Sequence, residues 1–301
     1  KHIEGRTVVA DVLAKFERYK ALRLNQKGQR WQLYFKIFCF LNPSEVASDS
    51  VEGLFLFEQF CENVAQGRFP AAENILCRLA SLRLQYTKGD YEPGAWVDNM
   101  SSVFPVEKIK RLRDRSASKA NSLGREKISG TLIGSIRKVV SPLVSRGLTE
   151  EAEEKAIEEA EQKAESSFIK SSICDYWKAH KGMTCQQAQE QYIEILQKWP
   201  GYSSTLFDVK STSADFPPEL WLGVSLEGIA VYKRYESRAI MTCEYEYILS
   251  FGAPKSNIYK IIAEDRGEIK FETSQVVEIA KLMKAYINEI VRRRTRQQER
   301  Q

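Results

Sequence analysis

The last hundred residues consist of short apolar segments separated by turns, followed by one long amphipathic stretch. In residues 274–294, apolar side chains recur every three or four positions, which is typical of a helix with one buried face. Residues 220–224 and 258–262, further upstream, have the pattern of half-buried strands. We therefore expect a sheet closed by one helix. The groove between such a helix and the sheet edge accepts a peptide as an added strand or as a helix. The apolar positions of the helix are Val276, Ile279, Ala280, Met283, Ile287 and Ile290.

Composition narrows the class of protein. The chain has 301 residues, 43% of them hydrophobic, which is enough for several buried cores. The net charge of +5 is too small to indicate a dedicated nucleic-acid binder, so we expect no nucleic-acid partner. No apolar run reaches about 18 residues, so no membrane span is predicted. No apolar core follows the charged residues 1–6, so they do not resemble a signal peptide.

The residues that usually carry chemistry are sparse. The six cysteines form no CxxC pair, and we expect them to be reduced packing residues of a cytosolic protein. The histidines are His2 and His180, neither at ligand spacing from a cysteine pair, and His180 is expected on the surface near a helix end. We find no phosphate-binding loop, HExxH, GxSxG or dinucleotide fingerprint. The sequence therefore predicts no enzyme, no cofactor and no metal site.

The first half of the chain alternates apolar runs with breaks. Residues 7–19 are predicted to be helical, and residues 31–40 to be a buried strand. Residues 49–91 are predicted to be mostly helical, with Pro70 near the start of a second helix and Gly89 at its end. The expected buried face of the first of these helices is Leu54, Phe57, Cys61 and Val64, widened by Phe55 and Phe60.

Residues 106–165 have a different composition. Residues 106–146 hold eleven Lys or Arg against three acidic residues, and residues 149–165 hold eight Glu and two Lys. One interpretation is a long, partly disordered insertion with a charged helical end. The other is a regulatory or lipid-contacting segment. In that case the candidate phosphorylation sites are Ser116, Ser118, Ser122 and Ser129.

Residues 174–199 return to a compact helical pattern. Thr184 and Gln187 have the spacing of a capping box, which predicts a helix start. Pro200 and Gly201 then mark the clearest domain boundary in the chain. The side chains expected to face inward are Ala188, Tyr192, Ile195, Leu196 and Trp199.

Several stretches resemble the FERM domains of MyTH4–FERM unconventional myosins, the myosin X group in particular. The matching stretches are RTVVADVLAKFE (6–17), LRLQY (82–86), GDY (89–91), WPGY (199–202), STLFDV (204–209), ELWLGVS (219–225), ILSFGAP (248–254), FETS (271–274) and AKLMKAYI (280–287). They are spread along the whole chain, and the basic insertion also resembles the corresponding loop of those myosins.

The resemblance implies an α+β fold of FERM-type lobes. Residues 1–45 would be a partial ubiquitin-like lobe, because only one helix and one strand are expected there. Residues 46–198 would be a helical, acyl-CoA-binding-protein-like lobe with an insertion at about 106–168. Residues 199–295 would be a PH/PTB-like β-sandwich with a C-terminal helix, followed by a basic tail at 296–301. The incomplete first lobe is expected to expose apolar surface.

The resemblance also implies a function. In this family the module recruits cargo, and its third lobe binds cytoplasmic tails of integrin-like adhesion receptors or netrin-receptor-like guidance receptors. It further implies an upstream MyTH4 domain and a cytoplasmic, cytoskeleton-associated location at the cell periphery and in filopodia. The expected groove residues are Ile248, Leu249, Ser250, Phe251, Gly252 and Ala253 on the strand side, and Lys281, Leu282, Lys284 and Ala285 on the helix side.

Two of these assignments have an ordinary structural alternative. Phe251 is placed where talin has a Trp, so it offers less stacking area, and it either anchors a ligand or packs as core. Lys281 and Lys284 either meet acidic groups of a peptide or form a solvated helix face.

A second hypothesis is a phosphoinositide-binding adaptor between membrane and cytoskeleton. Arg292, Arg293, Arg294 and Arg296 form a basic cluster that could contact anionic lipid. The same residues also suit the C-terminus of a helix, where cations are stabilised by the helix dipole.

Overall fold

A computed structural model of the chain describes residues 9–21, 36–95, 100–105, 166–212 and 215–299. The chain divides into two compact units. We call residues 1–41, 204–231 and 241–301 the sheet unit, and residues 42–203 and 232–240 the helical unit. Predictions that concern the insertion, its serines and the first half of the expected strand at 31–40 fall outside the described residues.

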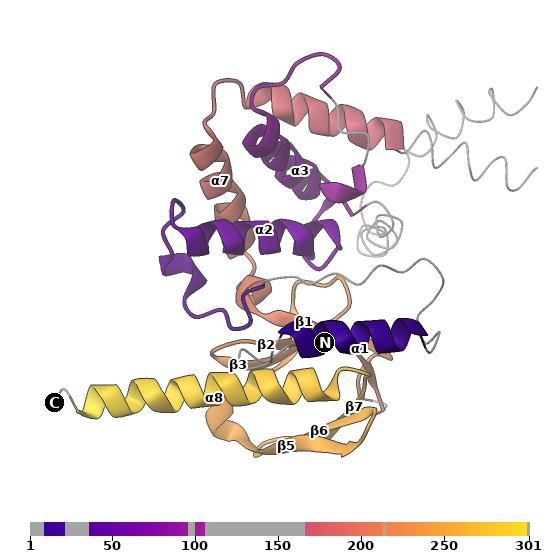
Figure 1. Cartoon of the computed structure of the whole chain (residues 1–301), viewed down its shortest axis with the longest axis vertical. Coiled ribbons are helices and arrows are strands. Elements are labelled where there is room, and N and C mark those ends of the chain that lie inside the picture. The colour runs from indigo at the N-terminus through magenta and orange to yellow at the C-terminus, as the bar shows by residue number, and fades with distance from the viewer. Residues whose placement is uncertain (1–8, 22–35, 96–99, 106–165, 213–214, 300–301) are drawn as a thin grey trace, which may run out of the picture. The chain divides into compact units, whose positions relative to one another are not determined.

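Seven strands form one antiparallel sheet (Figure 1). Their order is β4-β3-β2-β1-β7-β6-β5, so β4 and β5 lie at its two ends. The last three strands pair in chain order, with Ile261 opposite both Phe251 and Ile269. The strands are β1 (Thr205–Ser211), β2 (Glu219–Val224), β3 (Gly228–Lys233), β4 (Ala239–Glu244), β5 (Ile248–Lys255), β6 (Ile258–Ala263) and β7 (Gly267–Glu272), with the short helix η5 (Tyr245–Tyr247) before β5.

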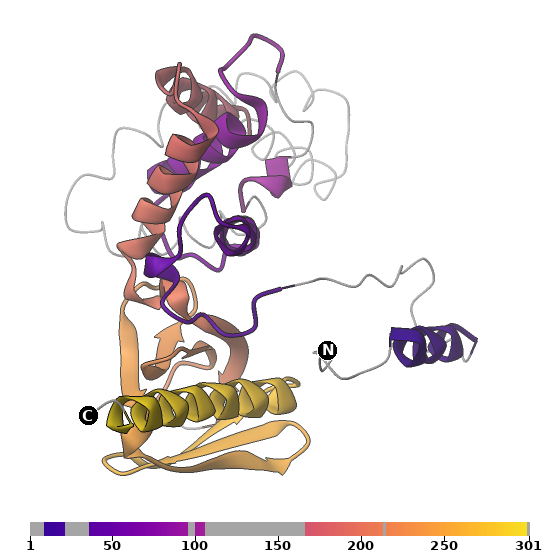
Figure 2. The same ribbon diagram turned by 60° about the vertical axis from the view of Figure 1, so that its left-hand side comes forward.

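Helix α8 (Val276–Gln298) closes the core of the sheet unit and packs against β2 and β5 (Figure 2). Three of the side chains predicted to be buried are buried, namely Val276, Ile279 and Met283. The other buried residues of α8 are Leu282 and Tyr286, whereas Ala280, Ile287 and Ile290 are half-buried. The buried face is therefore rotated from the face that apolar spacing predicts.

The rotation has a visible cause. Tyr286 is fully buried, and its hydroxyl accepts a hydrogen bond of 3.0 Å from the backbone N–H of Phe40. Phe40 lies in residues 36–41, a segment that we call the strap. The strap covers the Tyr286 side of α8, and periodicity within one helix cannot reveal such a distant cover.

The conformation of the strap differs from the prediction. Residues 36–40 are irregular and form no strand, although the sequence predicted a buried strand over 31–40. The apolar side chains of the strap are nevertheless used for packing, since Phe38, Cys39 and Leu41 lie against the core of the sheet unit. The apolar composition of residues 36–40 correctly predicts packing against a core, but it does not distinguish a strand from an irregular segment. The helix expected at residues 7–19 is present as α1 (Val9–Ala21).

The helical unit contains α2 (Val51–Ala65), α3 (Glu73–Lys88), a helix over residues 166–179 and α7 (Cys185–Gln197), with short 3-10 helices η1 (Pro43–Glu45), η2 (Met100–Ser102) and η4 (Pro200–Ser203). Two helix ends confirm sequence predictions. Thr184 and Gln187 form a complete capping box at the start of α7. Gly89, with a φ of 79°, ends α3 in a conformation that favours glycine.

The amide of Gln85 joins three segments of this unit. Gln85 is 1% exposed, and its Nε2 donates to the carbonyl of Met183 and to the Asp90 carboxylate, at 2.9 and 2.8 Å. Its Oε1 accepts from Trp177 Nε1 at 3.1 Å, and Asp90 also accepts from the Gly182 N–H at 2.8 Å. Three of these four bonds link residues more than ninety positions apart along the chain. The buried amide therefore helps to fix helices on both sides of the long insertion.

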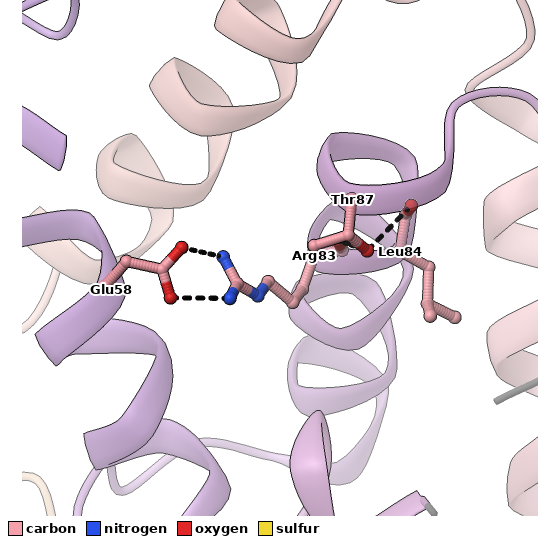
Figure 3. Close-up of polar contacts among 4 residues, drawn as sticks. All are labelled: Glu58, Arg83, Leu84 and Thr87. Carbon is pink, nitrogen blue, oxygen red and sulfur yellow. Dashed lines mark hydrogen bonds and ion pairs between the residues drawn. The ribbon is translucent and has the colours of Figure 1, made fainter. Parts of the chain in front are cut away.

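A second contact joins α2 to α3 (Figure 3). The guanidinium of Arg83 donates to both carboxylate oxygens of Glu58, at 2.7 and 2.6 Å. The same guanidinium lies over the rings of Phe57 and Tyr86, 5.3 and 5.5 Å from their centroids. Thr87 Oγ1 donates to the Arg83 carbonyl at 2.9 Å, within α3. This paired geometry restrains the crossing of α2 and α3, because a planar fork fits a carboxylate in few orientations.

The face of α2 differs in part from the prediction. Phe57, Phe60, Cys61 and Val64 are buried as expected, but Leu54 and Phe55 are 43% and 39% exposed. Leu56, which the predicted stripe omitted, is buried at 3% exposure. Four consecutive apolar residues over 54–57 are compatible with several helix faces, so spacing alone did not select the correct one.

His180 was expected on the surface but is buried, with 8% exposure. Ser81 Oγ donates to the carbonyl of Arg78 at 2.7 Å, and it lies 3.0 Å from His180 Nε2. Since the serine proton is already used, Ser81 accepts from His180 Nε2–H, which fixes the neutral tautomer. Burial, followed by the charge of Arg78, lowers the pKa of His180 below its usual value.

We therefore expect the stability of the chain to fall in mildly acidic solution. A histidine with a lowered pKa in the folded state binds protons more readily when unfolded. Its contribution is complete above about pH 6.5 and is lost as the pH falls below that value. Urea unfolding at pH 7.5 and pH 5.5 should show a lower midpoint at pH 5.5, and His180→Gln should reduce this difference. An unchanged difference in His180→Gln would show that other groups cause it.

Candidate peptide-binding groove

Strand β5 ends the sheet next to α8. Ile248 and Phe251 point to the core side of β5, because they pair with the buried residues Ala263 and Ile261, and both are half-buried against the core. Leu249 is 66% exposed, and Ser250 and Ala253 are exposed too. Among the described residues, β5 pairs with β6 alone, so its other edge has no strand partner there.

Only a short part of the open edge of β5 can pair regularly with another strand. Register shifts separate Ile248 from Ser250 and Gly252 from Lys255 in the pairing with β6. Residues 250–252 are therefore the continuous regular part, and Pro254 has no N–H to offer. A peptide added as a strand can form a regular ladder with only a few residues here. A longer peptide must also use the side of α8.

One row of side chains on α8 lies toward β5. Ala280 packs against the same core as Phe251, and Arg294 forms an ion pair with Glu246 of η5 at 3.8 Å. Helical spacing connects these two positions through Lys284, Ile287 and Val291. Val291 is 57% exposed and Lys284 is exposed, whereas Ile287 is half-buried. This row of α8 is thus partly apolar and open to solvent.

The four groove residues predicted on α8 lie on different sides of the helix. Lys284 lies in the row toward β5. Leu282 is 1% exposed and belongs to the core, so it is not available to a ligand. Lys281 and Ala285 are half-exposed and lie on the side of α8 away from its buried residues. The residues that the sequence motif predicts for the groove thus lie around α8 instead of following one side of it.

Two further exposed apolar residues, which the sequence analysis did not identify, lie on or beside these elements. Tyr247, immediately before β5, is 48% exposed, and Val277 at the start of α8 is 56% exposed. Val277, Ala280, Lys284, Ile287 and Val291 recur at intervals of three and four, which is the signal that could have identified this row. It was hidden because the buried face of α8 has the same spacing.

The basic cluster at the end of α8 is partly neutralised within the chain. Glu289 pairs with Arg293 at 2.9 Å and also with Arg292. Hydrogen bonding by Arg293, together with the charge of Arg292, holds the pKa of Glu289 below its usual value. Arg294 pairs with Glu246, and Arg296 is exposed. Surface pairs of this kind are weak and can be exchanged for other anions.

Two further observations concern the described residues alone. Within them, no group of three or more His, Cys, Asp or Glu side chains is arranged to hold a metal ion. In the same part of the chain, the helices are all too short or too polar to span a bilayer.

Residues 42–207 match the family model of the FERM central domain. This match covers more than half of the chain, and the chain therefore belongs to the FERM family. FERM domains are protein-interaction modules.

Curated relatives match along nearly the whole chain. Pleckstrin homology domain-containing family H member 3 of Homo sapiens is 23% identical over 303 residues, which covers 95% of this chain and 36% of that protein. The same protein of Mus musculus is 23% identical over 301 residues, with the same coverage. The chain thus spans about a third of the length of these relatives.

Solved structures of myosin tails have the same fold. The MyTH4–FERM MF1 domain of Dictyostelium discoideum myosin VII matches with a TM-score of 0.58 at 18% identity, over 96% of this chain and 48% of that chain. The C-terminal MyTH4–FERM domain of human myosin 7b, in complex with the harmonin-a PDZ3 domain, matches with a TM-score of 0.58 at 16% identity, over 91% and 47%. The fold is therefore FERM-like, with helices and a seven-stranded antiparallel sheet closed by a C-terminal helix as in a PH/PTB-like lobe.

Substitutions on α8 should separate its core from its solvent face. We expect Leu282→Ala to lower the free energy of unfolding by about 2–5 kcal/mol, because it leaves a cavity under the helix. Lys284→Ala, two positions away, should change it by less than about 0.5 kcal/mol, because Lys284 is exposed. Urea unfolding of the two variants measures both effects. Equal losses would contradict the placement of Leu282 in the core.

Proposed function

We propose that this chain is the cargo-binding FERM module of a MyTH4–FERM unconventional myosin tail of the myosin X type. Cytoplasmic tails of adhesion or guidance receptors, integrin-like or netrin-receptor-like, would dock between β5 and α8. The observation that carries the proposal is the unpaired edge of β5 beside the partly apolar row of α8.

The distribution of exposed apolar residues supports docking at this place. Tyr247, Leu249 and Val291 are 48%, 66% and 57% exposed, and all three lie on β5, just before it, or on the row of α8 toward it. Desolvating such residues is a common source of binding energy in peptide recognition. Phe251 and Ile248 lie deeper, since both are half-buried, and they form part of the floor.

The comparisons support a role in protein binding. The similar human MyTH4–FERM domain of myosin 7b was solved together with the harmonin-a PDZ3 domain, so a domain of this fold holds a protein partner there. By analogy, this module would follow an upstream MyTH4 domain in the sequence. It would be associated with the cytoskeleton at the cell periphery and in filopodia.

The proposed test uses two synthetic peptides and the full chain. One is an integrin-like tail peptide with an NPxY-type motif, which would add a strand. The other is an amphipathic helical peptide from a netrin-receptor-like tail, which would lie along α8. We expect at least one to bind with micromolar affinity or better in fluorescence titrations.

Substitutions should locate the bound peptide. Val291→Glu places a charge in the proposed groove, and we expect it to weaken binding by about tenfold or more. Val51→Glu on α2 is the matched control, because Val51 is 72% exposed in the helical unit, and its affinity should equal that of the wild type. Thermal unfolding of both variants checks that the fold is intact. Equal affinities of the two variants, or no saturable binding of either peptide, would contradict the proposal.

The second candidate function, a phosphoinositide-binding adaptor, is favoured by one observation. Four arginines occupy positions 292–296 of α8, and Arg292, Arg294 and Arg296 are exposed. Each could contribute about 1 kcal/mol of attraction to an anionic membrane surface.

This candidate predicts strong salt dependence. Vesicles that contain a phosphoinositide should bind the chain at low ionic strength and release it in high salt, because screening shortens the reach of surface charge. Arg294→Ala combined with Arg296→Ala should weaken binding, whereas Lys255→Ala on β5 serves as the single-charge control. The fraction of chain bound to vesicles is measured by sedimentation. If it does not change with salt concentration, or is the same without anionic lipid, the phosphoinositide-binding function is eliminated.

A further inference from the structure

The strap is attached to α8 at one buried hydrogen bond. The Phe40 N–H donates to Tyr286 Oη at 3.0 Å, with Phe40 3% exposed and Tyr286 fully buried. Phe38, Cys39 and Leu41 add partly buried apolar contact with the same core. Residues 36–41 form no helix or strand, and these contacts connect them to the core of the sheet unit.

The strap and the proposed groove lie on different sides of the same helix. Tyr286 faces the strap, since its hydroxyl accepts from the Phe40 N–H. Ala280, Ile287 and Val291 belong to the row toward β5. Figures 1 and 2 both show the chain just before η1 passing α8 on the side away from β5 and β6.

Helix α8 is therefore held between two contacts. On one side the strap fixes Tyr286, and on the other side β5 contacts the helix. Tyr286 and Ile287 are adjacent in sequence, so a small shift of Tyr286 also moves the groove wall at Ile287. Packed side chains transmit such shifts because protein interiors are dense.

We propose that the strap is a positioning element for the β5–α8 groove, so that docking of the strap on Tyr286 and binding of a peptide in the groove stabilise each other. This inference rests on the proposed function of the groove. By thermodynamic linkage, the factor by which a docked strap raises peptide affinity equals the factor by which a bound peptide favours strap docking. A partner or a modification that loosened residues 36–41 would then release cargo without touching the groove.

The test uses the full chain with methyl and amide labels for NMR. Tyr286→Phe removes the acceptor of the Phe40 N–H and keeps the ring. Phe38→Ala loosens the strap without altering α8, and it serves if Tyr286→Phe does not fold. Tyr259→Phe is the matched control, because Tyr259 is fully buried in the same core and donates to Met283 Sδ of α8 at 3.1 Å.

Three results are expected. In Tyr286→Phe and Phe38→Ala, hydrogen exchange at the Phe40 amide should accelerate by about tenfold or more. The methyl signals of Ile287, Val291 and Ile248 should shift in both variants, more than in Tyr259→Phe. The better of the two receptor-tail peptides should bind these variants about three- to tenfold more weakly, and peptide should slow exchange at the Phe40 amide of the wild type.

The outcomes separate the two proposals. If the Phe40 amide loses protection while the groove methyl signals and the peptide affinity stay as in the wild type, the strap is only a tether and the inference is wrong. Effects of equal size in Tyr259→Phe would also overturn it. If neither peptide binds the wild type, the proposed function fails, and the methyl shifts alone then decide whether the strap positions α8.

Discussion

The contact on which the sheet unit depends is the packing of α8 against the sheet. Val276, Ile279 and Met283 are buried in the core of the sheet unit, and their burial removes a large apolar area from water. Because α8 covers the core side of the sheet and not its edge, the same packing leaves β5 unpaired on one side. The proposed groove is thus a consequence of how the core is closed.

The edge of β5 is modified in ways that fit a controlled binding surface. Register shifts on both sides of residues 250–252, together with Pro254, limit uncontrolled pairing with other strands. The apolar residues Leu249 and Val291 remain exposed near this short segment. Short ladder length combined with apolar walls favours a ligand that uses both β5 and α8.

The sequence predicted much of the architecture, because apolar periodicity and capping residues act locally. The capping box of Thr184 and the end of α3 at Gly89 were recognised from a few residues, and the resemblance predicted the FERM fold. The errors arose where distant contacts decide. Tyr286 is buried where the Phe40 N–H donates to its hydroxyl, and His180 is buried against Ser81, ninety-nine residues away. The groove residues on α8 could be identified only in part, because the core face and the row toward β5 both repeat every three or four residues. The groove residues remain predictions.

We propose that a peptide binds between β5 and α8, and NMR can locate it there. The most direct measurement is methyl chemical-shift mapping of the full chain during titration with a receptor-tail peptide. We expect saturable shifts at Leu249, Val277, Ile287 and Val291, with Val51 and Leu54 of α2 unchanged. Shifts confined to α2, or none along β5 and α8 at a saturating peptide concentration, would contradict it.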